Sequence, residues 1–374
     1  MAAMKKALAK LRTSRMDEEE PVDDLDAAEE VIPFTYSITS YGADYPVDSL
    51  VKRIENQDVV VPTFGRQPTE DSEIVGFQRE YVWPRPKADR FIESLLLGLP
   101  VPGIFLVKEP SGVLLVLDGH QRLYTLRAFY EGVIHGEEYR LANVQERFQG
   151  KRYKDLDIED RRRLDDSIIH ATIVRQDEPT EDQSSIYVIF ERLNTGGVNL
   201  QPQEIRVALY HGEFVRVLRE LNDVDKWRAL YGRKSRRLKD MELILRFFAF
   251  FYYADQYQSP MKDFLNRYMA TNRRLERQSE TEIKKIFGQT TSTLCDAIGH
   301  RAFRPRTAVN AAVVDSLMTG VATRLAARGP IKDKQQFKEK YEKLLKDKEY
   351  IAAVESGTSQ EASVSTRLRL AKGP

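Results

Sequence analysis

The pattern of apolar and polar positions divides this chain into a mixed region and a region of helical periodicity. Leu114–Leu117 is short and wholly apolar, which is typical of a buried strand. Apolar residues three and four apart, as in Leu123, Leu126 and Phe129, indicate an amphipathic helix. From about residue 203 onward the pattern is almost entirely helical, so we expect an α+β domain followed by a mainly α-helical region.

The mixed region predicts short strands that alternate with helices. The helix after Pro86 has an apolar face, which we expect to pack on the sheet formed by its neighbouring strands. Residues 131–165 are polar and are expected to form a surface excursion. The predicted strands are 31–41, 59–62, 103–108, 114–117 and 170–176; the predicted helices are 47–55, 87–99 (buried face Phe91, Ile92, Leu95 and Leu96), one containing 123–129, and 184–193.

The charge pattern sets the expected domain boundaries. Residues 1–32 change from basic to strongly acidic and are predicted to be a disordered charged tail. We assign 33–202 to the α+β domain, 203–352 to a helical domain and 353–374 to a flexible basic tail. Within the helical domain, Met241–Tyr253 is predicted to be a core helix and Lys332–Tyr350 a charged amphipathic helix.

The chemistry of the mixed region is concentrated in the sequence Asp118-Gly119-His120-Gln121-Arg122. The preceding strand and the following helix predict a sharp turn here, with Asp118 as the helix N-cap. Free N–H groups at a helix N-terminus favour an anion, Gly119 permits close approach of a ligand, and Arg122 can bind a phosphate with two donors. The alternative is an ordinary capped helix whose arginine faces solvent, and residue chemistry alone does not decide between the two.

Composition narrows the classes of protein that fit. The 58 basic and 57 acidic residues nearly balance, so net charge argues neither for nor against nucleic acid. One cysteine, Cys295, excludes a disulfide framework and a cysteine-based zinc cluster, and the five histidines show no paired metal-ligand spacing. The basic start of the chain lacks the apolar segment of a signal peptide, and Phe247–Tyr253 is too short to span a bilayer. We expect a soluble cytoplasmic protein.

The strongest basic cluster is Arg233–Lys239. Five cations in one short segment can bind phosphate backbones, whereas most charge runs are simply solvated surface. The candidate nucleic-acid contacts are Arg233, Lys234, Arg236, Arg237 and Lys239.

Three stretches in order resemble a known family. They are Phe77–Trp83, with the sequence FQREYVW, the Asp118–Arg122 turn, and Phe190–Arg206, with the sequence FERLNTGGVNLQPQEIR. Together they are similar to the N-terminal domain of GmrSD-type restriction enzymes, a group within the ParB/sulfiredoxin-like superfamily. The family's central motif is usually Asp-Gly-Gln-Gln-Arg after a strand ending in Ile or Val, so Leu117 and His120 depart from it. His120 either supplies an imidazole that titrates near neutral pH or replaces an amide hydrogen bond.

The resemblance implies a small ParB/sulfiredoxin-like sheet-and-helix domain that binds and hydrolyses a nucleoside triphosphate in defence against foreign or modified DNA. In related ParB domains a Gly-x-x-Arg turn binds nucleotide phosphates, and Gly119 and Arg122 match it. The family is commonly fused to or paired with an HNH nuclease. The isolated histidines here argue against a fused one, so DNA cutting belongs to this domain or to a separate subunit.

We therefore predict one site in which polar groups from the three motifs converge with Mg²⁺ on a nucleoside triphosphate. The alternatives are a buried ion-pair network that only joins two subdomains, a nucleotide-gated DNA-sensing or scaffold module without chemistry, and a ParB-like DNA-nicking nuclease. The sequence does not settle whether the chain forms a homo-oligomer. The predicted catalytic residues are Asp118, His120, Arg122 and Glu204; the nucleotide-binding residues are Gln78, Arg79, Gly119, Gln121, Asn194, Thr195, Gly196, Gly197 and Arg206; the metal ligands are Asp118 and Glu204.

Overall fold

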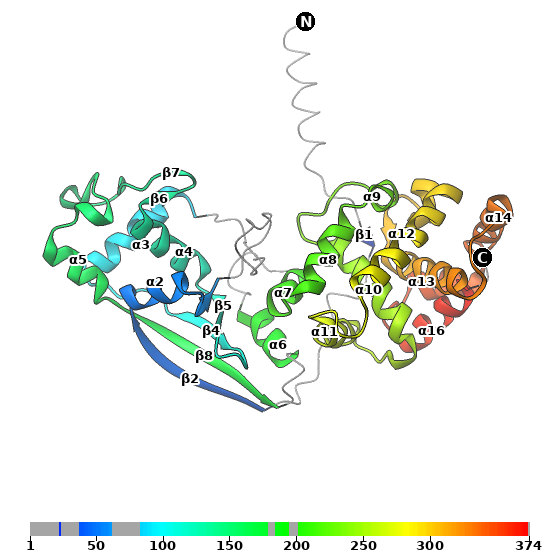
Figure 1. The fold of residues 1–374 in the computed structure, drawn as a ribbon, viewed down its shortest axis with the longest axis horizontal. Coiled ribbons are helices and arrows are strands. Elements are labelled where there is room, and N and C mark those ends of the chain that lie inside the picture. Colours follow the sequence, from blue (N-terminus) through cyan, green and yellow to red (C-terminus); the bar gives the residue numbers. More distant parts are fainter. Residues whose placement is uncertain (1–21, 24–36, 62–82, 179–183, 194–200, 373–374) are drawn as a thin grey trace, which may run out of the picture. The chain divides into compact units, whose positions relative to one another are not determined.

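The computed structural model describes residues 22–23, 37–61, 83–178, 184–193 and 201–372, which divide between two compact units. One unit comprises 34–199 and 207–211, and the other comprises 1–33, 200–206 and 212–374. The first unit contains a mixed sheet with helices, and the second is mainly helical (Figure 1). The predicted fold class, an α+β domain followed by a helical region, is confirmed.

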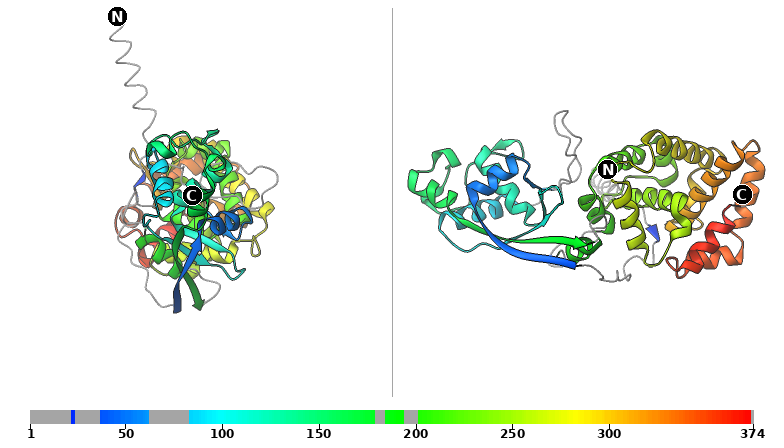
Figure 2. Two further views of the ribbon diagram at one scale, coloured as in Figure 1. Left: turned by 90° about the vertical axis from the view of Figure 1, so that its left-hand side faces the viewer. Right: turned by 60° about the horizontal axis from the view of Figure 1, so that its bottom comes forward.

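The first unit is built on a five-stranded sheet with the order β2-β8-β4-β5-β3. β4 runs antiparallel to β5 and parallel to β8, and the turn at Glu109–Gly112 joins β4 to β5 as predicted. β2 and β8 pair along their whole length and form a long ribbon (Figure 2). The strands are β2 (Ser37–Pro46), β3 (Val59–Val60), β4 (Ile104–Lys108), β5 (Leu114–Asp118) and β8 (Ile168–Glu178).

Helices pack on this sheet because the residues on both faces of its strands are apolar. Leu114 and Val116 of β5 share a core with the apolar faces of the helices, and Leu115 and Leu117 on the other face of the strand are buried too. The predicted face of the helix after Pro86 is part of this core. The helices are α2 (Val47–Glu55), α3 (Arg85–Leu96), α4 (His120–Glu131), α5 (Ile158–Asp165) and α6 (Ser184–Leu193).

The prediction that residues 131–165 form a surface excursion is wrong in part. Tyr139, Leu141 and Phe148 in this segment are fully buried in the core of the sheet domain. The sequence pattern does not reveal this contribution to the core, because the few apolar residues of the segment are separated by many charged residues that face solvent. The segment contains the short strands β6 (Val133–Ile134) and β7 (Glu137–Glu138), the 3₁₀ turns η1 (Glu146–Phe148) and η2 (Tyr153–Asp155), and α5.

The second unit is a helical assembly in which α10 (Lys239–Tyr253) and α13 (Ala311–Arg328) pack together, with residues 240–241, 243–250 and 311–322 buried. The predicted core role of the helix ending at Tyr253 is confirmed by its buried phenylalanines Phe247, Phe248 and Phe250. Its helices are α7 (Pro202–Leu209), α8 (Glu213–Asn222), α9 (Asp225–Tyr231), α10 (Lys239–Tyr253), α11 (Met261–Asn272), α12 (Glu280–Ala297) and α13 (Ala311–Arg328), with 3₁₀ turns η4 (Ala254–Gln256) and η5 (Gly299–Phe303). The final residues of α7, 207–209, belong to the first unit.

The C-terminal region differs from the prediction in two respects. The single helix expected over Lys332–Tyr350 is two helices, α14 (Lys334–Leu344) and α15 (Lys348–Glu355), because Asp347 caps the second. The flexible basic tail expected over 353–374 contains α16 (Glu361–Leu370). Arg367 of α16 is buried and forms a two-bonded ion pair with Asp315, which explains why a basic segment folds here.

The N-terminal tail lies mostly outside the described residues. Within it, β1 (Val22–Asp23) pairs in parallel with β9 (Val309–Asn310) of the helical unit. The prediction of disorder is therefore wrong for Val22 and Asp23. The first part of the strand expected over 31–41 is outside the described residues, and β2 takes its place from Ser37. Among the described residues, no helix is both long and apolar enough to cross a membrane.

Candidate functional site

The centre of the candidate site is the turn between β5 and α4. Gly119 forms this turn with φ of 99°, a left-handed conformation that glycine adopts without strain. A Cβ atom at this position would lie 2.4 Å from Ile104 Cγ2 on the neighbouring strand. Both the backbone conformation and the close packing therefore require glycine, and this explains why an Asp-Gly sequence ends the strand.

The N-cap of α4 is Gly119 and not Asp118 as predicted, and no side chain caps the helix. The first helical hydrogen bond runs from Leu123 N to Gly119 O, so the N–H groups of residues 120–122 lie before the helical bonding pattern begins. The start of α4 thus presents donors and the positive end of the helix dipole, the arrangement that favours an anion.

Asp118 fails to cap the helix because Arg122, four residues further on, takes its carboxylate. Arg122 Nη2 donates to Asp118 Oδ2 at 2.8 Å and to the carbonyl oxygen of Gly103 at 2.9 Å. The arginine side chain is 14% exposed and the aspartate side chain 44%, so the pair opens to solvent on the carboxylate side. Arg122 Nε is buried without a hydrogen-bond partner among the described residues. Nothing in the sequence around Gly103 identified it as a member of the site.

The side-chain amide of Gln121 forms hydrogen bonds through both its oxygen and its nitrogen. Its Oε1 accepts the main-chain N–H of Trp83 at 3.2 Å, and its Nε2 lies 3.1 Å from His120 Nε2. Because the amide oxygen faces Trp83, the amide nitrogen donates to His120, and the proton of the neutral ring is then on Nδ1. Gln121 is 7% exposed, so the amide orients two neighbours from within the domain. Its predicted role as a direct nucleotide ligand stays a prediction.

The bond to Trp83 connects the first motif to the central turn. Trp83 is the last residue of the motif that begins at Phe77, and it also packs edge-to-face on Phe91. The predicted site residues Gln78 and Arg79 lie outside the described residues. Their approach to the turn stays a prediction. Trp83 is the residue of their motif that the structure describes.

The third motif is only partly described, since Asn194, Thr195, Gly196 and Gly197 lie outside the described residues. Glu204 and Arg206 belong to the helical unit, whereas the turn belongs to the sheet unit, and their convergence on the turn stays a prediction. Glu204 accepts the main-chain N–H of Gln201 and pairs with Arg237 at 3.1 Å.

Arg206 is 1% exposed and pairs with Glu242 at 2.9 Å. It also donates to Asn266 and to Gln203. The burial of Arg206 and its pairing with the half-buried carboxylate of Glu242 favour the structural alternative for Arg206 over the predicted contact with nucleotide.

The basic cluster 233–239 is mixed in its exposure. Arg233, Lys234 and Arg236 are exposed, and Lys234 pairs with Asp223. Arg237 and Lys239 are half-buried. Ser235 in the middle is buried, with its N–H bonded to Asp240, so the segment is a fixed turn. Its DNA-binding role stays a prediction.

No group of three or more His, Cys, Asp or Glu side chains suited to a metal occurs among the described residues. Asp118 is nevertheless compatible with Mg²⁺, because Mg²⁺ in nucleotide sites is usually held by one or two carboxylates together with phosphate oxygens and water. Arg122 bonds to Oδ2 of that carboxylate, and the aspartate side chain is 44% exposed.

The fold and the turn define a small α+β domain with an aspartate–arginine pair at an uncapped helix start. Residues 50–211 match the family model described as the GmrSD restriction endonuclease, N-terminal domain. This segment is therefore a GmrSD-type N-terminal domain, and it relates the protein to restriction and defence systems. The comparison with curated proteins finds no match to the chain.

Proposed function

We propose that the turn 118–122 binds the phosphates of a nucleoside triphosphate together with Mg²⁺, and that the protein hydrolyses this nucleotide as part of a system that restricts foreign or modified DNA. The observation that carries the proposal is the Asp118–Arg122 pair at the open N-terminus of α4. The family match at 50–211 supports the restriction context.

The pair suits a magnesium-bound triphosphate because the ligand brings both signs of charge. A phosphate oxygen would replace the carboxylate as the partner of Arg122, while Asp118 would turn from the arginine to the cation. The hydrogen bond from Arg122 to the Gly103 carbonyl keeps the guanidinium oriented during this exchange. The N–H groups at the start of α4 add donors for a second phosphate oxygen.

Hydrolysis needs little further chemistry from the chain. Water attacks the γ-phosphorus, the bond to the β,γ-bridging oxygen breaks, and the proton of the water leaves with phosphate. Catalysis of this step is mainly positioning and stabilisation of charge on the phosphoryl oxygens. Bound Mg²⁺ would neutralise part of that charge. Arg122 would do the same from the side of the protein.

The test is binding and turnover of each of the four nucleoside triphosphates by the full chain, with and without DNA. Arg122→Ala should lower turnover by about 10²–10³-fold, because it removes a fixed cation from the phosphates. Arg127→Ala is the matched control. Arg127 lies on the same helix in an exposed ion pair with Glu131, and its loss should leave turnover unchanged.

Turnover by Arg122→Ala at the rate of the original protein would show that the site is elsewhere. Tight nucleotide binding without release of diphosphate would instead support a nucleotide-gated DNA-sensing or scaffold module. DNA nicking by the chain alone would support the ParB-like nuclease. Dependence of nicking on an added subunit would identify a separate nuclease as the partner.

A further inference from the structure

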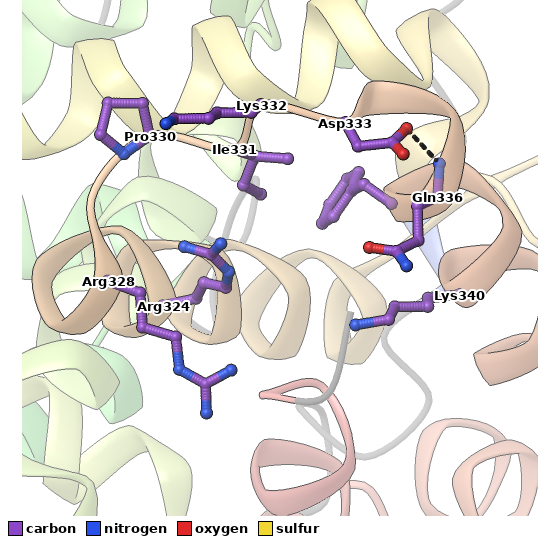
Figure 3. Close-up of a pocket in the computed structure, with 9 residues that line it drawn as sticks. Arg324, Arg328, Pro330, Ile331, Lys332, Asp333, Gln336 and Lys340 are labelled. Atoms are coloured by element: carbon purple, nitrogen blue, oxygen red, sulfur yellow. Dashed lines mark hydrogen bonds between the residues drawn. The ribbon is translucent and has the colours of Figure 1, made fainter.

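A pocket of about 300 Å³ lies between the end of α13 and the start of α14 in the helical unit (Figure 3). Its volume is at the lower end of the roughly 300–1,000 Å³ typical of ligand sites. Side chains from the end of α13, from the connecting segment and from the first turns of α14 surround it. The lining residues are Arg324, Arg328, Pro330, Ile331, Lys332, Asp333, Gln336, Phe337 and Lys340.

The lining is strongly cationic. Four of its side chains are basic, Arg324, Arg328, Lys332 and Lys340, and Asp333 is its one carboxylate. Asp333 is the N-cap of α14 and accepts the main-chain N–H of Gln336 at 2.9 Å, so it is already engaged by the helix. In the part of the chain that the structure describes, neither Arg328 nor Lys332 forms an ion pair.

The four cations line one pocket and repel one another there, and an anion bound among them relieves that repulsion. Guanidinium groups match the geometry of phosphate oxygens, and lysine adds point charges at the rim. The first turn of α14 contributes the positive end of its dipole in the same place. We propose that this pocket binds a backbone phosphate of a nucleic-acid strand.

A strand phosphate fits the lining better than a free nucleotide does. Phe337, the only aromatic residue of the lining, is 3% exposed, so a nucleotide base would have no exposed ring on which to stack. Arg328, Lys332 and Lys340 are exposed at the surface. Exposed cations around a shallow phosphate site position a strand without reading its sequence.

This proposal is independent of the proposed nucleotide site. The pocket contains none of the residues of the Asp118–Arg122 turn, and it is distinct from the basic cluster 233–239. Arg122→Ala should therefore leave DNA binding in the absence of nucleotide unchanged. Failure of one proposal would not imply failure of the other.

The experiment measures binding of the full chain to a labelled DNA duplex by fluorescence anisotropy at several salt concentrations. The double variant Arg328→Gln/Lys332→Gln should bind about tenfold more weakly at low salt, and the slope of log affinity against log salt should fall by about two units. The matched control is Lys343→Gln/Lys346→Gln. It removes the same charge from exposed positions in the last turn of α14 and just after it, outside the pocket, and should change affinity less than about twofold.

A second variant separates binding from folding. Gln336→Glu places a carboxylate in the pocket at the third position of α14, where glutamate favours a helix that starts with a capping aspartate. It should weaken DNA binding while the melting temperature stays the same or rises.

Two outcomes would overturn the proposal. Equal loss of DNA binding in the pocket variant and in the control would mean that only diffuse surface charge matters. Loss of inorganic pyrophosphate binding in the pocket variant, with DNA binding intact, would assign the pocket to a free phosphate compound instead of a strand.

Discussion

The main-chain N–H of Trp83 donates to the side-chain oxygen of Gln121, which joins the segment before α3 to the first turn of α4. Gln121→Leu would remove the acceptor of this N–H and the donor to the ring nitrogen of His120, and both bonds are half-buried. We expect the free energy of unfolding to fall by about 1–3 kcal/mol, the cost of such unsatisfied groups. Urea unfolding measures it. Arg127→Gln, exposed on the same helix, is the control and should change stability little; an equal loss in both variants would contradict the argument.

Gly119→Ala should destabilise the protein more than Gly132→Ala. Both glycines have a positive φ, but a Cβ at 119 meets Ile104 at 2.4 Å, whereas nothing lies within 4 Å of one at 132. We expect about 1 kcal/mol from backbone strain at 132 and about 2–4 kcal/mol from strain and overpacking at 119. Denaturant unfolding of the pair measures the difference. Equal stabilities would mean that the strand carrying Ile104 yields to the new methyl group.

Arg206→Ala tests whether the third motif is structural or binds nucleotide. Removing this side chain leaves the half-buried Glu242 with Arg246 as its remaining cation, and it leaves Asn266 without the donor from Arg206; we expect a loss of about 3 kcal/mol in unfolding free energy. Nucleotide affinity of the protein that remains folded should not change. A variant of normal stability that no longer binds nucleotide would contradict this and restore the contact predicted from the sequence.

Arg367→Ala tests whether α16 is part of the fold. The ion pair with Asp315 is fully buried, so truncation of one partner should cost about 3–5 kcal/mol. Arg369→Ala on the same helix is the control, because its pair with Glu349 is exposed and should contribute less than about 1 kcal/mol. Thermal unfolding distinguishes them, and equal melting temperatures would show that α16 is dispensable.

Acid stability should depend on Glu280, which joins α12 to α8. Hydrogen bonds from Arg216 and then Lys284 lower the pKa of Glu280 to about 2. An unfolded glutamate titrates near pH 4.3, so the pair's contribution is complete above about pH 4.3 and is lost as pH falls toward 2. Because the side chain is 33% exposed, we expect less than about 1 kcal/mol.

In Glu280→Gln, the melting temperature should fall less steeply over this acid range than in the original protein. Glu339→Gln, an exposed carboxylate on α14, is the control and should keep the original slope. A Glu280→Gln variant with an unchanged slope would show that another group accounts for the loss of stability in acid.

Local patterns predicted the elements around the site well. The apolar run before Asp118 and the helical spacing after Gly119 are short-range signals, and β5 and α4 follow them. The predicted N-cap, Asp118, is one residue too early because Asp118 has two competing partners, the helix N–H groups and Arg122. Only the three-dimensional structure shows that Arg122 takes the carboxylate, with Gly103 holding the same guanidinium nitrogen.

The errors arose where the deciding partner is distant in sequence. Arg367 lies 52 residues from Asp315, so nothing in the basic segment around it indicates a buried helix. Tyr139 and Phe148 are isolated among charges, and only the fold reveals that they fill the core beneath the sheet helices. Asp347 is, by contrast, a local signal, since a capping residue can restart a helix within an amphipathic run.

The orientation of the Gln121 amide has a consequence for proton transfer. With Nε2 of His120 accepting a hydrogen bond from the Gln121 amide, the neutral ring carries its proton on Nδ1. The ring therefore cannot accept a proton from water at Nε2 while that bond persists. Deprotonation of an attacking water must then fall to another group or to the phosphate itself.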